Sequence, residues 1–516
     1  MNFSSSKILK IFCLLAILPF SLYSQNKKAV RAEIETTEEA KPFTIVNLGK
    51  SGVLILSKLN EFVDRKTRNW SFTFYNNILQ KKWIKKLPLS EDFSYQGYEF
   101  EKDTAYLIFY KADKHSNDKN LKIISLELLK GNHTSMDTLL TDKSQLTNLE
   151  SFQHHLFFTL ENKSNIMLVN IDYYLRSFKE IVIDKNDNTN VECMTIDSLN
   201  KVVYLLIKKE VSKHSNSFFL RKYDFSGSEL SSIEIKNTDE SRKLLTGMIT
   251  LLKDGSIAIA GSYNLSDEKT SSYAETSVLS EAAGTYFVKM VKDSIHPIHF
   301  INFLSYENIN KYLNKREVSK IKKIQENKTQ KEFSLNYLLI EHKLIQMDHQ
   351  IVMVAEALYP EYRVISDMTY DYYGRMTPTS RTIFDGYRYT NAFVLCLDEE
   401  GNTKWNQLFD IWNILSMEIK EKVSVMPLKD DVLISYNDDG ELVYKIMNDT
   451  TTSFDIGNLK VEMSYANDKA MFSPSSNIDY WYANYYLVFG IQTIKNNSLA
   501  NRSKRTVFYM NKVSFE

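Results

Sequence analysis

From residue 43 onward the chain alternates short apolar runs with polar turns, a pattern typical of β-strands joined by hairpins. One example is the apolar run at residues 249–252, which is followed by a Lys-Asp-Gly-Ser turn and a second apolar run at residues 257–260. The turns carry Asn, Asp and Gly, which adopt the left-handed backbone of tight hairpins at low cost. The pattern predicts a protein built almost entirely of antiparallel strands.

Strand pairs recur at intervals of about 40 to 60 residues, which favours radial repetition over a single sandwich. We therefore predict an all-β fold, a β-propeller of seven or eight blades, in which the last strands close against the first. Glycine is scarce, at 15 residues, and no blade repeats a fixed Trp-Asp ending. These two features favour the alternative of two β-sandwich-like domains that divide near residue 310.

Two stretches interrupt the strand pattern within a single propeller domain predicted for residues 42–516. Residues 306–330 are rich in Lys, Glu and Asn, with apolar residues at helical spacing, and predict a short helical insertion. Residues 359–388 are rich in Tyr and Arg and predict a long loop without regular structure. Loops of this length usually carry function or are disordered.

The beginning of the chain has the order of a secretory signal. Lys7 and Lys10 precede an apolar run at residues 11–20, and small or polar residues follow it. A run of about ten residues is too short to span a bilayer, which takes about 20. We expect a signal peptide at residues 1–24, a flexible leader at residues 25–41, and no membrane span after signal cleavage. The protein is then exported, to the periplasm or the outer cell surface.

Charge and motifs exclude several classes of function. Lys plus Arg and Asp plus Glu both number 64, so the formal charge is zero and no basic surplus points to nucleic acid. The sequence holds neither a Gly-x-Ser-x-Gly elbow nor a phosphate-binding glycine-rich loop. Asp438 and Asp439 fall in a predicted hairpin turn, where solvated carboxylates are the expected outcome.

The histidines predict no metal site. His154 and His155 are adjacent, so on a regular strand their side chains face opposite sides and do not bind one ion together. No His-x-His pair occurs in the chain. We predict neither a metal nor a cofactor.

A cluster of Tyr and Arg residues supplies the candidate binding site. These side chains are enriched at binding hot spots because they bring a large contact area and directed donors. The alternative is that the rings pack down over the mouth of the propeller. The candidate residues are Tyr370, Tyr372, Tyr373, Arg375, Arg381, Tyr387, Arg388 and Tyr389.

Several stretches of the C-terminal third resemble uncharacterised secreted β-propeller-like proteins of the Bacteroidota. They are VAEALYPEY from Val354, FDGYRYTNA from Phe384, WYANYY from Trp481 and RTVFYMNKVSFE from Arg505. The resemblance implies residence in the periplasm or at the outer surface and supplies no activity.

Two functions remain open from the sequence. The first is an exported non-enzymatic binding or scaffold protein that recognises a protein or glycan partner through one propeller face. The second is a glycan-active hydrolase or lyase whose acids are dispersed among the blades and meet only in the folded protein. Carboxylates that converge in a deep pocket would favour the second.

Overall fold

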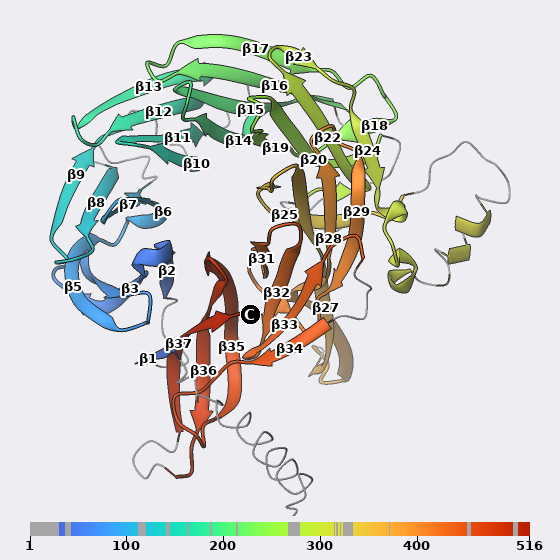
Figure 1. The fold of residues 1–516 in the computed structure, drawn as a ribbon. Coiled ribbons are helices and arrows are strands. Elements are labelled where there is room, and N and C mark those ends of the chain that lie inside the picture. The colour runs from blue at the N-terminus through green and yellow to red at the C-terminus, as the bar shows by residue number, and fades with distance from the viewer. Residues whose placement is uncertain are drawn as a thin grey trace, which may run out of the picture.

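The computed structural model describes residues 30–36, 43–111, 120–140, 145–162, 165–185, 188–212, 215–266, 279–313, 315, 318–319, 321–323, 334–370, 372–450, 456–498 and 504–515. Within these residues the strands form eight antiparallel sheets. The sheets follow one another around a common axis and make a ring (Figure 1). The signal peptide predicted for residues 1–24 lies outside the described residues.

Five of the sheets are four-stranded meanders of consecutive strands. They comprise β2 (Thr44–Asn47), β3 (Val53–Phe62), β4 (Thr67–Tyr75) and β5 (Lys81–Ser90); β6 (Ser94–Glu101), β7 (Thr104–Tyr110), β8 (Leu121–Glu127) and β9 (His133–Thr138); β10 (Gln145–Phe152), β11 (His155–Glu161), β12 (Ile166–Asp172) and β13 (Ser177–Asp184); β14 (Thr189–Asp197), β15 (Val202–Ser212), β16 (Ser215–Asp224) and β17 (Glu229–Ile235); and β31 (Val423–Pro427), β32 (Val432–Asp438), β33 (Glu441–Met447) and β34 (Ile456–Lys460). The short 3-10 turn η1 (Gly49–Ser51) separates β2 from β3.

Two larger sheets contain additional short strands. The six-stranded sheet comprises β18 (Arg242–Leu244), β19 (Met248–Leu251), β20 (Ile257–Leu265), β22 (Gly284–Val291), β23 (Ser294–Ile295) and β24 (His299–Asn302). The seven-stranded sheet comprises β21 (Glu281–Ala282), β25 (Tyr337–Glu341), β26 (Ile345–Gln346), β27 (Gln350–Tyr370), β28 (Met376–Asp398), β29 (Thr403–Asp410) and β30 (Leu415–Ser416).

The remaining sheet joins the two ends of the chain. It contains β35 (Lys469–Tyr482), β36 (Tyr485–Lys495) and β37 (Lys504–Ser514), and its outermost strand is β1 (Arg31–Glu35), which pairs with β37. A strand from the beginning of the chain therefore completes the last blade. The predicted flexible leader at residues 25–41 is wrong for this part, because residues 31–35 are a paired strand.

The polar side chains of β1 explain why its sequence resembles a leader. The side chain of Arg31 is buried, and its guanidinium donates to Asn511 Oδ1 at 2.8 Å and to Gln492 Oε1 at 3.1 Å. Its Nε also donates to Glu33 at 2.8 Å. Arg31 and Glu33 therefore both have specific polar partners, which lowers the free-energy cost of burying their charges. Because those partners lie near the other end of the chain, local sequence does not show them.

Packing closes the ring at every sheet boundary. Eight clusters of buried apolar side chains lie between neighbouring sheets of the described chain, each cluster joining two successive sheets. The cluster at the junction of the two chain ends contains Val53 and Ile55 of β3 together with Leu487 and Phe508 of β36 and β37. The predicted β-propeller is confirmed, and the alternative of two sandwich-like domains is wrong.

The predicted helical insertion is short. It contains η2 (Phe303–Ser305) and η3 (Ile309–Tyr312), and residues 315, 318–319 and 321–323 are also helical. Residues 324–333 lie outside the part of the chain that the structure describes. No helix in the described chain is long and apolar enough to cross a membrane.

Candidate functional site

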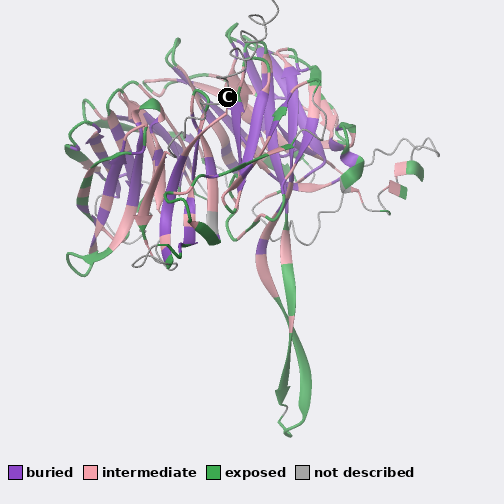
Figure 2. Ribbon diagram, turned by 60° about the horizontal axis from the view of Figure 1, so that its bottom comes forward, coloured by how far each residue is buried: buried purple, intermediate pink, exposed green. Residues whose placement is uncertain are grey.

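The segment predicted as a long loop, residues 359–388, is a β-ribbon, and that prediction is wrong. Strands β27 and β28 stay paired from Gln350↔Asp398 to Tyr370↔Met376, far beyond the body of their sheet. Figure 2 shows this ribbon projecting from the ring, with exposed residues along its outer part. A two-stranded ribbon is exposed on both faces, so it lacks the apolar alternation by which a strand is recognised in sequence. Its Thr, Val and Ile residues are nevertheless good strand formers.

Four of the eight candidate binding residues gather at the tip of the ribbon. Tyr370, Tyr372 and Tyr373 are 70%, 97% and 77% exposed. The rings of Tyr372 and Tyr373 meet edge to face at 5.5 Å, and the Arg375 guanidinium lies 5.6 Å from the centre of the Tyr373 ring. The tip therefore presents aromatic surface and a cation to solvent, in the combination that favours recognition.

The other four candidates lie along the ribbon and at its base. Arg381 lies on the shaft, 3.9 Å from Asp367. At the base, Arg388 pairs with Glu361 at 2.5 Å, and the Tyr387 ring packs against Phe384 at 5.1 Å. Tyr389 is 1% exposed and belongs to the core. The eight residues thus form an exposed tip and a structural base rather than one site.

Tyr389 ties the ribbon to the loop that follows its sheet. Its hydroxyl donates to the Lys420 carbonyl at 2.7 Å and accepts from the Lys420 amide at 3.2 Å. The short strand β30 of the same loop pairs with Tyr387 and Arg388 on β28. The ribbon base and the loop at residues 411–422 therefore form one connected unit.

This loop forms part of the wall of a pocket of about 640 Å³. The remaining walls come from the β32–β33 turn, from β35 to β37 and from Phe43, so the pocket lies between the last two sheets. Both the ribbon and the β32–β33 turn connect the middle strands of their sheets, and they consequently lie on the same face of the ring. The charged and hydroxyl-bearing side chains that line the pocket are those of Ser416, Glu418, Lys420, Glu421, Lys422, Asp438, Asp439, Ser473, Ser476 and Asp479.

The pocket perturbs its ionisable groups. Burial raises the pKa of Asp479 to about 6, and the charge of Glu421 adds to the effect. Burial likewise raises the pKa of Asp438 and of Asp439. Burial lowers the pKa of Lys422 to about 8, assisted by the charge of Lys420. Perturbed groups that gather in a concave site are typical of functional sites.

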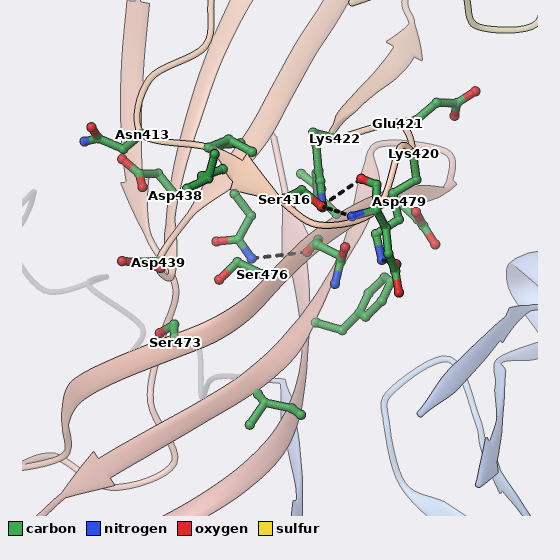
Figure 3. A pocket seen from close by; sticks show the side chains of 18 of the residues that line it. Asn413, Ser416, Lys420, Glu421, Lys422, Asp438, Asp439, Ser473, Ser476 and Asp479 are labelled. Carbon is green, nitrogen blue, oxygen red and sulfur yellow. Dashed lines mark hydrogen bonds and ion pairs between the residues drawn. The ribbon is translucent and has the colours of Figure 1, made fainter. Parts of the chain in front are cut away.

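Asp438 and Asp439 differ from the solvated pair that the sequence predicts, because their turn faces the pocket. Figure 3 places these two residues and Ser473 toward one end of the pocket, and Lys420, Glu421 and Asp479 toward the other. The acids come from different sheets and meet only in the folded ring. No linear motif marks them.

A buried ion pair supports the rim of the pocket. Glu356 on β27 is fully buried and accepts hydrogen bonds from the backbone amides of Lys422 and Val423, both at 2.9 Å. His342 Nε2 lies 2.7 Å from the same carboxylate, and His342 Nδ1 lies 3.8 Å from Glu421. Burial alone would lower the pKa of His342, but the hydrogen bond and charge of Glu356, with the charge of Glu421, raise it. Sequence reasoning missed this pair, because Glu356 is buried on β27 and His342 is buried in the connection between β25 and β26.

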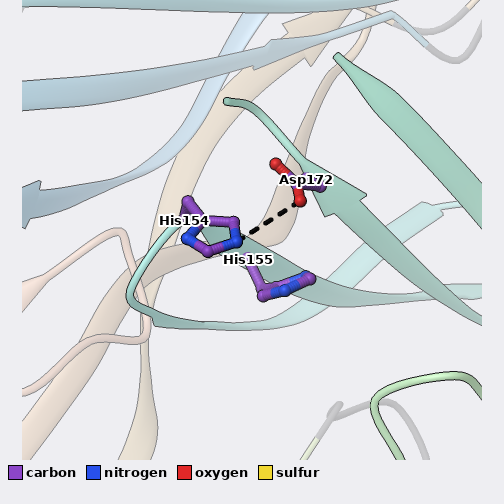
Figure 4. A group of neighbouring side chains, drawn as sticks. All are labelled: His154, His155 and Asp172. Atoms are coloured by element: carbon purple, nitrogen blue, oxygen red, sulfur yellow. Dashed lines mark ion pairs between the residues drawn. The ribbon is translucent and has the colours of Figure 1, made fainter. Parts of the chain in front are cut away.

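A second cluster lies on the opposite face, where β10 turns into β11 and β12 ends. His154, His155 and Asp172 each offer one ligand atom, and these atoms lie within 4.8 Å of one another (Figure 4). The expectation that the two histidine side chains face opposite sides of a strand is wrong, because His154 lies in a turn and not on a regular strand. The alternation of side chains across a strand therefore does not apply to it.

No protein-family model matches this chain, and no curated protein matches it. Solved structures do match, among them the polysaccharide lyase Uly1, at 9% identity and a TM-score of 0.37 over 83% of this chain and 93% of that one. The β-propeller domain of the Trilobed protease from Pyrococcus furiosus matches at 8% identity and a TM-score of 0.33, over 81% and 94% of the two chains. Similarity at this level identifies no shared substrate or reaction.

Proposed function

We propose that this chain is an exported, non-enzymatic recognition protein that binds a protein or glycan partner through the ribbon-bearing face. The observation that carries the proposal is the ribbon itself. Its tip holds Tyr372, Tyr373 and Arg375 in solvent, where large aromatic side chains are costly unless another surface covers them. Export is supported by the charged start, short apolar run and polar exit of residues 7–25.

The ribbon is built to present its tip at a defined place. Cross-strand ion pairs run along it, between Arg363 and Asp385 at 2.9 Å and between Arg388 and Glu361 at 2.5 Å. At the base, Tyr389 fixes it to the pocket loop. Presentation on a paired and anchored element reduces the conformational entropy that a partner must remove on binding.

The pocket beside the ribbon base supplies the polar part of the same surface. Its lining contains five carboxylates, Glu418, Glu421, Asp438, Asp439 and Asp479, and two ammonium groups, Lys420 and Lys422. An acidic surplus of this kind complements an amine or guanidinium of a bound partner, and carboxylates also accept hydrogen bonds from sugar hydroxyls.

The test removes the tip and leaves the fold intact. The variant replaces Tyr372, Tyr373 and Arg375 by Ser, and the control Tyr174→Ser removes an 81% exposed tyrosine from the β12–β13 turn on the opposite face. Binding to an envelope extract of the producing cells and to a glycan array is compared at equal protein concentration. We expect wild type and control to retain the same partner, and the tip variant to lose at least tenfold in affinity with an unchanged Tm. Equal binding by the tip variant would contradict the proposal.

A second candidate, a glycan hydrolase or lyase, is favoured by one specific observation. Burial raises the pKa of Asp479 to about 6 in a pocket that also holds Glu421, and a carboxyl group with a raised pKa is what general acid catalysis requires. The test is a panel of acidic and neutral polysaccharides incubated with wild type, Asp479→Asn and Glu421→Gln. Chain cleavage by wild type that both variants abolish would establish the enzyme. Cleavage that survives both substitutions, or none by wild type, would dismiss this pocket as its active site.

A further inference from the structure

The cluster of His154, His155 and Asp172 lies away from the ribbon-bearing face and plays no part in the proposed function. It sits at the turn between β10 and β11, on the side of the ring where outer hairpin turns such as β12–β13 also lie. Gln153 adopts a positive φ of 55°, the left-handed conformation that reverses the chain at this point. This reversal places His154 beside its neighbour, and their ring centres are 4.6 Å apart.

Hydrogen bonds orient His155 as a metal ligand. Its Nδ1 lies 3.1 Å from Asn170 Oδ1, while Asn170 Nδ2 donates to the Phe225 carbonyl at 2.8 Å. Because the amide nitrogen of Asn170 is occupied as a donor, its oxygen must accept, and His155 Nδ1 therefore carries the proton. In the neutral ring this leaves the lone pair on Nε2. Metal-binding histidines are characteristically held in this way, with the other ring nitrogen donating to a fixed acceptor.

Asp172 is oriented by a similar division of its two oxygens. Its Oδ1 accepts from the backbone amides of Tyr174 at 3.0 Å and Leu175 at 2.8 Å. Its Oδ2 lies 3.4 Å from His154 Nε2. Ligands that surround a tetrahedral zinc ion at 2.0–2.1 Å lie about 3.3–3.4 Å from one another, so this separation matches one edge of such a site.

We propose that His154, His155 and Asp172 bind a divalent transition metal, with Zn²⁺ as the preferred ion. Two imidazoles and one carboxylate are a ligand set suited to zinc and unsuited to Ca²⁺ or Mg²⁺, which prefer oxygen ligands. His155 and Asp172 are direct cross-strand partners, so the backbone holds two of the ligands in fixed register. The His154 side chain is 42% exposed, which leaves the ion open to solvent and provides a free coordination position.

A direct His154–Asp172 ion pair is the competing explanation of the 3.4 Å separation. It accounts for two of the three side chains and does not involve His155. The two explanations differ in what happens when Zn²⁺ is added, since an ion pair without metal affinity produces no binding heat and no change in metal spectrum.

The experiment uses the folded full chain without a histidine tag, stripped with EDTA and titrated with Zn²⁺ by calorimetry. We expect one ion per chain, with affinity at least tenfold weaker in His154→Ala, His155→Ala and Asp172→Asn. The control His349→Ala removes another surface histidine, whose side chain is 84% exposed, and should retain wild-type affinity. His154→Ala is the decisive variant, because its side chain lies at an exposed turn and its loss leaves the core intact.

Co²⁺ provides a second, spectroscopic readout. It compares wild type with His154→Ala alone, so it does not depend on whether the His155 and Asp172 variants fold. Wild type should develop the intense visible absorption of low-coordinate Co²⁺ with nitrogen and oxygen ligands, and His154→Ala should lose it. The proposal is overturned if wild type binds no Zn²⁺ at 100-fold molar excess. It is equally overturned if His154→Ala binds Zn²⁺ as tightly as wild type, because the ion then lies elsewhere.

Discussion

Arg505 on β37 and Glu33 on β1 form an ion pair at 3.1 Å, which joins residues 472 positions apart. The same guanidinium lies 2.6 Å from Asp468, and the hydrogen bond with Asp468 raises the pKa of Arg505 above its ordinary value. Arg505 is buried, so it links the first strand, the last strand and the segment before β35 at the point where the ring closes.

Replacing Arg505 by Met should therefore destabilise the protein by about 3 kcal/mol, because two carboxylates then lose their shared cation. The measurement is urea denaturation at pH 7. Lys504→Met, which changes the exposed neighbouring residue, is the matched control and should change the free energy of unfolding by less than about 0.5 kcal/mol. An equal effect of the two substitutions would show that the ion pairs of Arg505 do not stabilise this closure.

The ionised side chain of Asp479 should lower the free energy of unfolding at neutral pH. Its folded pKa of about 6 lies above its ordinary value of 3.8, so the folded state binds more protons than the unfolded state between these values. Stability then falls as the pH rises from about 4 to 6. Asp479→Asn should stabilise the protein by about 1–2 kcal/mol at pH 7 and have almost no effect at pH 4.

Urea denaturation at the two pH values checks this, with Asp430→Asn in an exposed turn as the control. A pH-independent effect of Asp479→Asn would contradict the environment assigned to the pocket. A stabilising substitution at a pocket residue is also what a functional site predicts, since such sites retain groups that cost stability.

The buried pair of His342 and Glu356 should also lose stability as the pH rises, but in a higher pH window than Asp479. The folded pKa of His342 is raised, so its contribution is fully present below the ordinary value of 6.5 and is lost as the pH rises through the folded pKa. His342→Gln should therefore cost about 1–3 kcal/mol at pH 6 and less at pH 9. His349→Gln, on the surface, should cost little at either pH. A loss that is the same at pH 6 and pH 9 would mean that the ring is not charged in the pair.

Tyr389 should control the mobility of the pocket wall. Tyr389→Phe removes the hydroxyl that bonds both the carbonyl and the amide of Lys420, at a cost of about 1 kcal/mol. Hydrogen exchange at residues 411–422 should become faster in this variant. Tyr387→Phe, whose ring packs on Phe384 at the ribbon base, is the control and should leave that exchange unchanged. Equal protection of the loop in both variants would rule out the clamp.

The regular part of the fold was predictable from the sequence because hairpins leave a local signal. The turn at residues 253–256 does separate two paired strands, β19 and β20, and the spacing of such pairs correctly predicts the ring. The local sequence pattern does not reveal a strand whose partners lie far away in the chain, or a strand that packs on no core. Strand β1 is polar because Arg31 and Glu33 meet partners near the other end of the chain, and the outer ribbon has no core to impose alternation.

The candidate site divides in the same way. The richness of residues 370–389 in Tyr and Arg makes this segment a candidate binding site, but only the structure separates the exposed Tyr372 from the buried Tyr389. The pocket acids Glu421, Asp438 and Asp479 come from three segments that meet where the last two sheets pack together, so no spacing rule finds them. The same holds for Asp172, which completes the histidine cluster from a neighbouring strand.

The most direct test of recognition through the ribbon is site-specific photo-crosslinking in the producing cells. A benzophenone amino acid replaces Tyr372 at the ribbon tip in one variant and Tyr174 on the opposite face in another; both side chains are highly exposed. Recognition through the ribbon predicts a discrete crosslinked species from position 372 and none from position 174. Crosslinks from position 174 alone, or none from position 372, would contradict it.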